Sequence, residues 1–163
     1  MLRFGVLTVS DRSARGERPD TSGPALVELI KSQGWEVTHT DILPDDLSIL
    51  RESLAAWADR GDADIILTTG GTGFAPRDIT PEATRAVIER EAPGLVEAMR
   101  SVSGAKSPHA MLSRAVAGIR GKVLIINLPG SPKAAVENLQ VVLLALEHAV
   151  QLLQEDPNAE AGH

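Results

Sequence analysis

Short apolar runs rich in β-branched residues alternate along the chain with longer segments of helical spacing, which is the pattern of an α/β fold. Five such runs predict strands, at residues 2–10, 35–42, 63–69, 114–119 and 122–127. The run at 63–69 is apolar or β-branched almost throughout, as expected for a central strand covered on both faces. We therefore expect a layered α/β fold whose sheet is mostly parallel.

Helices are expected between and after the strands, at residues 24–33, 46–60, 80–91, 93–100 and 131–153. Thr80 and Ser131 are expected to cap their helices, since each precedes a proline at the first helical position. The last helix carries apolar residues at spacings of three and four. Such a stripe faces the core or a partner helix, and we expect the core.

Two polar stretches, residues 11–21 and 101–108, are expected to be loops. The chain beyond residue 155 is polar and is expected to fray. We find no internal repeat and no domain-sized linker. The sequence thus predicts a single domain over residues 1–154 and a polar tail over residues 155–163.

Composition narrows the classes of function. The 163 residues include no cysteine, which excludes a disulfide scaffold, a thiolate metal site and a cysteine nucleophile. The net charge of −6 and an aromatic content of 2% argue against a nucleic-acid-binding protein. No apolar run approaches the ~20 residues of a membrane span, and the first residues lack the layout of a signal peptide. We expect a cytoplasmic protein with no membrane or nucleic-acid partner.

Polar loops follow the strands that should end at one edge of a parallel sheet, where ligands bind in such folds. The glycine loop, residues 70–73, has three glycines in four residues. Glycine lets a backbone approach a ligand closely and adopt positive φ, and exposed N–H groups in such a loop bind anions. A tight turn without a ligand is the alternative. The loop is neither a Walker A motif, since Phe74 follows Gly73, nor a dinucleotide motif, since Pro76 stands where glycine is needed.

Two aspartates lie just beyond strand ends, Asp45 after the second strand and Asp78 after the glycine loop. Paired carboxylates beside phosphates are the usual protein ligands of Mg²⁺. The alternatives are a helix N-cap for Asp45 and a solvated loop charge for Asp78. Ser131 opens the last helix, whose free N–H groups can bind an anion, and Lys133 adds a positive charge.

The histidines are weak candidates for catalysis. Only His109 lies beside a loop that could face a site, and surface exposure is the more common fate of such a residue. No histidine or carboxylate cluster has the spacing of zinc ligands, and no Ser–His–Asp arrangement can be recognised.

A series of motifs in fixed order carries a resemblance to a known family. They are LTVSDR at 7–12, DTSGPAL at 20–26, PDD at 44–46, TTGGTGFAPRDITPEAT at 68–84, PGLVEAMR at 93–100, MLSRAVAG at 111–118 and NLPGSPKA at 127–134. From residue 2 to about 153 the chain resembles the molybdopterin adenylyltransferase family of molybdenum-cofactor biosynthesis, the MogA/MoaB family. The long central motif is the most specific of the set.

The resemblance implies a three-layer α/β/α sandwich with a mixed sheet, assembled into trimers or hexamers. It also implies an enzyme that joins the AMP of MgATP to the terminal phosphate of molybdopterin and releases pyrophosphate. The two catalytic carboxylates of the family fall on Asp45 and Asp78, which would also hold Mg²⁺. Nucleotide and phosphate contacts would be Thr69, Gly70, Gly71, Thr72, Gly73, Gly130, Ser131 and Lys133. The pterin side would be Ser10, Asp11, Arg12 and Ser22.

The lack of a candidate catalytic histidine agrees with this reaction. A phosphate monoester is mostly dianionic at neutral pH, so the nucleophile needs no general base and a catalytic histidine is not required. Two alternatives stay open: a paralogue that binds molybdopterin without turnover, and an oligomeric scaffold. The molybdate-inserting enzyme is a candidate partner, and the choice between molybdenum and tungsten stays open.

Overall fold

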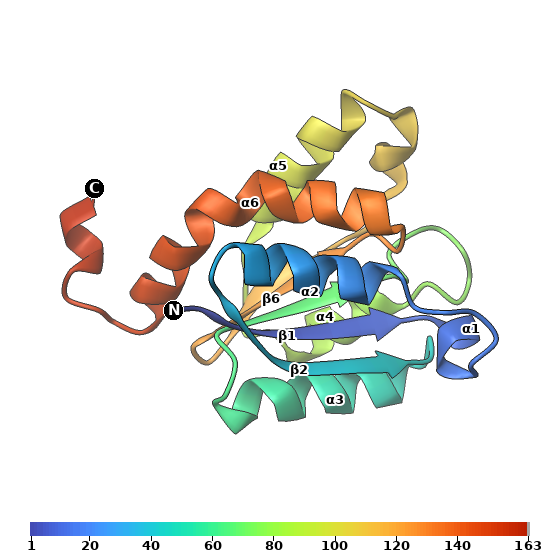
Figure 1. The fold of residues 1–163 in the computed structure, drawn as a ribbon, viewed down its shortest axis with the longest axis horizontal. Helices are drawn as coiled ribbons and strands as arrows, with labels where there is room; N and C mark the ends of the chain where they lie inside the picture. The colour runs from blue at the N-terminus through green and yellow to red at the C-terminus, as the bar shows by residue number, and fades with distance from the viewer. Residues whose placement is uncertain (163) are drawn as a thin grey trace.

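A six-stranded sheet forms the middle layer of the fold in this computed structural model, which describes residues 1–162. The strand order is β2-β1-β3-β6-β5-β4. The parallel strands are β1 (Arg3–Val9), β2 (Glu36–Leu43), β3 (Ile65–Thr69) and β6 (Val123–Leu128). β5 (Ala117–Arg120) pairs antiparallel with β6, and the two-residue strand β4 (Arg90–Glu91) pairs antiparallel with β5. The expected mostly parallel sheet is confirmed, and Figure 1 shows β1 and β2 pointing the same way.

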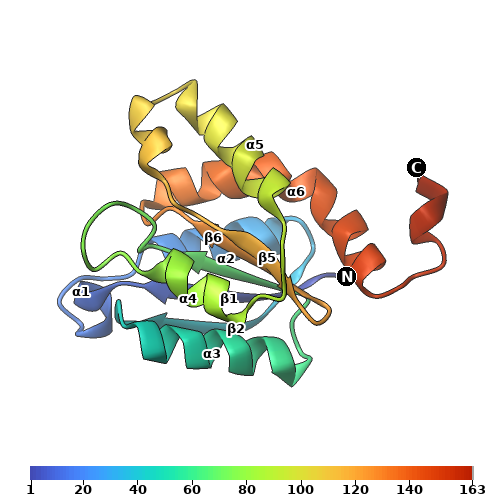
Figure 2. The same cartoon turned by 180° about the vertical axis from the view of Figure 1, so that it is seen from behind.

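Helices cover both faces of this sheet, so the three-layer α/β/α sandwich is also confirmed (Figures 1 and 2). One face carries α2 (Ser22–Ser32), α5 (Pro93–Gly104) and α6 (Pro132–Leu153). The other face carries α3 (Leu47–Arg60) and α4 (Thr80–Val87). Gly34 and Gly61, at φ +79° and +81°, follow α2 and α3 as the sequence predicts.

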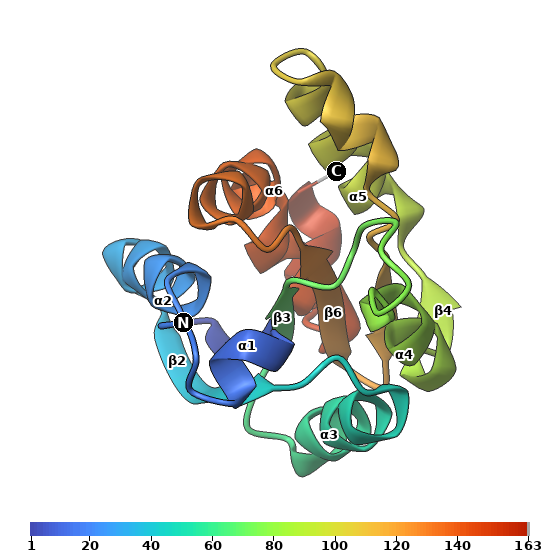
Figure 3. The ribbon, with the colours of Figure 1, turned by 90° about the vertical axis from the view of Figure 1, so that its right-hand side faces the viewer.

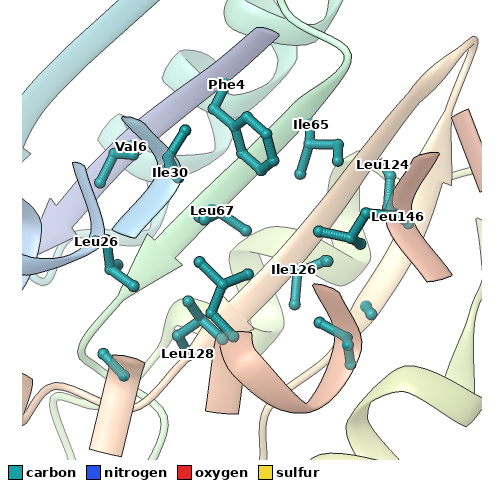
Figure 4. Packing of buried hydrophobic residues seen from close by; sticks show 14 of the residues in the cluster. Phe4, Val6, Leu26, Ile30, Ile65, Leu67, Leu124, Ile126, Leu128 and Leu146 are labelled. Carbon is teal, nitrogen blue, oxygen red and sulfur yellow. The ribbon is translucent and has the colours of Figure 1, made fainter. Parts of the chain in front are cut away.

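Alternation along β1 divides the core between the two faces. Phe4 and Val6 belong to the cluster beneath α2, α5 and α6, while Leu7 and Val9 belong to the cluster beneath α3 and α4. Figure 4 shows the first cluster, with Phe4 beside Ile65 and the strand residues facing the helices. Each fully buried side chain of this kind contributes roughly 1.5–3 kcal/mol of transfer free energy, which fixes the sheet on which the loops stand.

The expected loop at residues 11–21 begins with a short helix instead, α1 (Asp11–Ala14). Ser10 caps it, because its hydroxyl accepts a hydrogen bond from Ser13 N at 3.2 Å. A single helical turn has too little periodicity to be seen in sequence.

The helix expected at residues 80–91 ends early, at Val87. Sheet pairing overrides helical propensity here, because Glu89 N donates to Ile119 O at 2.7 Å and residues 90 and 91 form β4 beside β5. The expected cap is also wrong. The Thr80 hydroxyl donates to Gly70 O at 3.0 Å, so it closes the base of the glycine loop rather than capping α4.

The loop expected at residues 101–108 is helical over its first half, because α5 continues to Gly104. Tertiary contacts hold this extension against α6. Asn138 Nδ2 donates to Ser103 Oγ at 3.2 Å, and Lys106 pairs with Glu137 at 3.7 Å. The short 3-10 helix η1 (Pro108–Leu112) follows.

The last helix is capped as predicted, since Ser131 Oγ accepts from Ala134 N at 3.1 Å. Among residues 1–162, α6 is the one helix that is long and apolar enough to cross a membrane, by length and composition only. It packs against α2, α5 and β6 and supplies Leu139 and Leu146 to the core, as a core helix does. After α6 the tail forms a further turn, η2 (Ala159–Gly162), in which Ala159 is buried.

Candidate functional site

The loops that follow the parallel strands meet at one edge of the sheet, as the sequence predicts. Figure 3 looks onto this edge, with α1, the loop after β3 and the start of α6 facing the viewer. They enclose a cleft of about 650 Å³. Its lining includes most of the expected site residues, namely Ser10, Asp11, Arg12, Ser22, Asp45, Thr69, Gly70, Gly71, Asp78, Gly130 and Ser131.

Three expected site residues lie elsewhere. Thr72 and Gly73 line a second cavity, of about 330 Å³, on the far side of the glycine loop. His109 lines that cavity too. Lys133 is exposed at the start of α6 and, among the residues that the structure describes, lines neither of these two cavities. Its role in phosphate binding stays a prediction.

The glycines of the loop are required by contacts within the protein. Gly70 and Gly71 have φ of +105° and +67°, which other residues rarely adopt. A Cβ on Gly71 would lie 2.4 Å from Thr80 Oγ1 and 3.0 Å from Asp45 Oδ1. The loop is therefore packed tightly against Thr80 and Asp45, so a side chain at Gly71 would disturb the fold as well as any ligand.

Asp45 does not cap the following helix. Asp46 does so, by accepting from Ile49 N at 3.0 Å. Asp45 instead exchanges hydrogen bonds with Asp11: Asp45 N donates to Asp11 Oδ1 at 3.0 Å, and Asp11 N donates to Asp45 Oδ2 at 3.1 Å. The reciprocal pair joins the loop after β2 to the loop after β1 and leaves Asp45 Oδ1 facing Gly71.

The pKa values of the two carboxylates of this pair are shifted in opposite directions. Burial raises the pKa of Asp45, the Asp11 N–H opposes it, and the negative charges of Asp11 and Asp78 raise it further. Hydrogen bonds from Arg77 lower the pKa of Asp11. Arg77 Nε and Nη2 reach the Asp11 carboxylate at 2.5 and 2.9 Å, and Nη2 also donates to Asp45 O at 3.0 Å. Arg77 thus compensates Asp11, whereas its positive charge lowers the pKa of Asp45 too little to offset burial and the acidic neighbours.

Asp78 is more than a solvated loop charge. It is partly buried, it lines the cleft, and its Oδ2 accepts from Ala75 N at 3.0 Å. Gly73 lies close to the same oxygen, since a Cβ there would stand 2.9 Å from Asp78 Oδ2. The loop after β3 therefore fixes the direction of this carboxylate.

The carboxylates fit a magnesium ion held jointly with phosphates. Residues 1–162 contain no group of three or more histidine, cysteine or acidic side chains that could hold a metal by themselves. Mg²⁺ needs only one or two protein carboxylates when substrate phosphates and water supply the rest. Asp45 and Asp78 line one cleft, and the charge of Asp78 raises the pKa of Asp45, a repulsion that a cation between them would relieve.

Sequence reasoning missed two charged residues of the cleft wall, Arg18 and Asp20. Asp20 accepts from Thr8 Oγ1 at 2.8 Å and from Gly23 N at 3.1 Å, so it joins the start of α2 to β1. Both lie in the polar stretch that the sequence assigns to a loop. The motif DTSGPAL, which begins at Asp20, was the one signal available.

Comparison with known proteins agrees with the resemblance. Residues 5–148 match the protein family described as "Probable molybdopterin binding domain". The molybdopterin adenylyltransferase of Helicobacter pylori J99 is 43% identical over 154 residues, which cover 93% of this chain and 88% of that protein. The crystal structure of the molybdopterin biosynthesis enzyme MoaB from Thermus thermophilus superposes with a TM-score of 0.90 at 52% identity, over 96% of this chain and 99% of that one.

A longer relative shows the same unit within a larger protein. The molybdenum cofactor synthesis protein cinnamon of Drosophila melanogaster is 46% identical over 159 residues. That match covers 95% of this chain but 26% of the fly protein, so the chain spans about a quarter of its length. The match of residues 5–148, the bacterial relative and the shared fold place this chain in the molybdopterin-binding domain family of molybdenum-cofactor biosynthesis proteins.

Proposed function

We propose that this protein is a molybdopterin adenylyltransferase, which transfers AMP from MgATP to the terminal phosphate of molybdopterin. The products are adenylyl-molybdopterin and pyrophosphate. One observation carries the proposal: the cleft at the strand ends brings Asp45 and Asp78 together with a glycine loop and a capped helix N-terminus. The bacterial relative that shares 43% identity bears the name of this activity.

The reaction is an in-line displacement at the α-phosphorus of ATP. An oxygen of the pterin phosphate forms the new P–O bond, and the bond to the β-phosphate breaks with pyrophosphate leaving. The attacking phosphate is mostly dianionic near neutral pH, so no group needs to accept a proton. The protein must therefore position two polyanions and offset their charge.

The residues of the cleft are suited to both tasks. Asp45 and Asp78 would hold Mg²⁺, which supplies charge neutralisation at the ATP phosphates when bound. Gly130 and Ser131 lie at the N-terminus of α6, where the helix dipole would favour a bound phosphate. Arg12 adds positive charge to the cleft, beside Ser10, Asp11 and Ser22 on the proposed pterin side.

The polar cleft and the second cavity would hold different parts of the two substrates. The glycine loop and the turn before α6 separate the polar cleft from the second cavity, which Thr72, Gly73 and Pro129 also line. We place the phosphates over this shared wall and the nucleoside of ATP in the second cavity. A scaffold would have no need of this arrangement.

We further propose a closed homo-oligomer, a trimer or a hexamer, in the cytoplasm, with the molybdate-inserting enzyme as recipient of the product. Support for assembly is the outer face of α6, where Leu144 is fully exposed and Leu152 is 45% exposed. Light scattering tests it, since a 17.3 kDa monomer at micromolar concentration contradicts the proposal.

The decisive experiment is turnover by the wild-type protein. Mixed with MgATP and molybdopterin, it should release pyrophosphate in amounts equal to the adenylyl-molybdopterin formed. A molybdopterin-binding paralogue would bind the pterin, measured by calorimetry, and release none. A scaffold would neither turn over nor bind the pterin.

A further inference from the structure

Arg114 lies outside the cleft but holds the loop that carries Asp78. It stands between η1 and β5, within the motif MLSRAVAG, to which the sequence assigned no role. Its backbone N–H donates to Thr72 O at 2.8 Å. Its side chain donates to two further carbonyl oxygens of the same loop, from Nε to Gly73 O at 2.8 Å and from Nη2 to Asp78 O at 2.6 Å.

These bonds join the two ends of the segment 73–78. Within the segment, Asp78 N donates to Ala75 O at 2.9 Å, and Ala75 N donates to Asp78 Oδ2 at 3.0 Å. The turn is thus closed by hydrogen bonds of Asp78 within the segment and by those of Arg114 from outside it. The base of the loop is fixed separately, where Thr80 N donates to Gly71 O at 3.1 Å.

The guanidinium group is matched to this task. Its planar fork presents several N–H donors in fixed directions, so one side chain can satisfy Gly73 O and Asp78 O at once. The remaining nitrogen of the fork pairs with Glu82 in the first turn of α4. A lysine ammonium on a flexible stem keeps the charge but not the fixed pair of directions.

We propose that Arg114 is a positioning residue for adenylyl transfer, which sets the Asp78 carboxylate by fixing the backbone on both sides of its turn. The inference rests on the proposed function, in which Asp78 meets the metal and the ATP phosphates. A displacement of about 1 Å at a reacting group can cost on the order of 100-fold in rate. Arg114 itself lines neither of the two cavities proposed for the substrates.

Arg114→Lys tests the inference, with Arg120→Lys as its matched control. Arg120 is 29% exposed in its side chain, against 36% for Arg114. It likewise bonds a carbonyl, Val87 O at 2.9 Å, and a carboxylate, Asp59 at 2.9 Å. It lies at the opposite end of the sheet, beside the β5–β6 turn.

We expect Arg114→Lys to lower kcat by roughly 10- to 100-fold and to raise the Mg²⁺ concentration needed for half-maximal rate. Its KM for molybdopterin should not change, because the pterin side of the cleft is untouched. Arg120→Lys should keep the wild-type kcat, KM and Mg²⁺ dependence. The carboxyl ¹³C resonance of Asp78 should shift in Arg114→Lys and stay in place in Arg120→Lys.

Several outcomes would overturn the inference. They are wild-type kcat in Arg114→Lys, an equal loss in Arg120→Lys, or an unmoved Asp78 resonance. Failure of Arg114→Lys to fold, read by circular dichroism, would assign the residue to the fold alone and also overturn it. A wild-type protein that releases no pyrophosphate would instead refute the proposed function, and the Asp78 resonance would still decide the position of the carboxylate.

Discussion

The two ends of the sheet hold aspartates in opposite circumstances. At the amino end, Asp64 is 5% exposed and accepts hydrogen bonds from Arg3 N, Nε and Nη2 and from Gln154 Nε2, at 2.8–3.3 Å. At the carboxyl end, the described residues give the Asp45 carboxylate one donor, Asp11 N. It faces the negative charges of Asp11 and Asp78 instead.

The difference separates structural charge from functional charge. A buried carboxylate whose oxygens are satisfied by a cation supports the fold, and removing its charge leaves donors without a partner. A carboxylate that faces other negative charges makes the protein less stable, and a bound cation would relieve this repulsion. By this criterion Asp64 belongs to the scaffold, whereas Asp45 fits the proposed metal site that it would share with Asp78.

The largest predicted effect is a loss of turnover on substitution of Asp78, at the carboxyl end of the parallel strands. Asp78→Asn keeps the size of the side chain and one acceptor oxygen but removes the charge. Pyrophosphate release should fall by at least about 100-fold, the scale of losing one major electrostatic stabiliser. Molybdopterin binding, measured by calorimetry, and the melting temperature should hardly change. Wild-type turnover at limiting Mg²⁺ would remove Asp78 from the metal site.

The same substitution at the amino end should act on stability. Asp64→Asn loses the ion pair with Arg3 and should lower the free energy of unfolding by about 1–3 kcal/mol. Urea denaturation measures this loss. Turnover per folded molecule should stay at the wild-type value, and a selective loss of turnover would break the distinction between the two ends.

A smaller effect is expected from a methyl group placed against Asp78. Gly73 has an ordinary φ, so Gly73→Ala strains no backbone dihedral, but its Cβ would stand 2.9 Å from Asp78 Oδ2. The carboxylate must move, and turnover should fall about tenfold. Gly94→Ala is the control, because a Cβ on Gly94 meets nothing within 4 Å. Equal turnover in both variants would contradict a fixed Asp78.

The smallest predicted effect is a difference between the pKa values of Asp45 and Asp11 in the metal-free protein. Carboxyl ¹³C resonances should show Asp45 titrating above its ordinary pKa, because of burial and its acidic neighbours, and Asp11 below it, because of Arg77. By linkage, Asp11 contributes stability above its ordinary pKa that is lost as the pH falls through its folded-state pKa. Asp45 acts oppositely, since its ionisation costs stability as the pH rises through its raised pKa. A reversed order of the two midpoints would refute this electrostatic picture.

Regular hydrophobic patterns made much of the fold predictable. The five expected strands and the Ser131 cap are present, because period-two alternation and capping residues are local signals. Asp45, Asp78 and the first two glycines of the loop line one cleft, since parallel strands bring their following loops to one edge.

Features that depend on distant contacts could not be predicted. α1 is one turn long, and the extension of α5 to Gly104 depends on Ser103 and Asn138 meeting across two helices. The same limit applies within the site. Which aspartate receives the hydrogen bonds of Arg77 on its carboxylate depends on where Arg77 points, 66 positions along the chain from Asp11.

The most direct test of the contrast is pyrophosphate release measured side by side for wild type, Asp45→Asn and Asp64→Asn, across a range of Mg²⁺ concentrations. The measurement is made at a temperature where circular dichroism shows all three proteins folded. We predict that wild type and Asp64→Asn give the same rate at every Mg²⁺ concentration, while Asp45→Asn falls by at least about 100-fold. Equal rates for wild type and Asp45→Asn, or equal losses in both variants, would contradict the account.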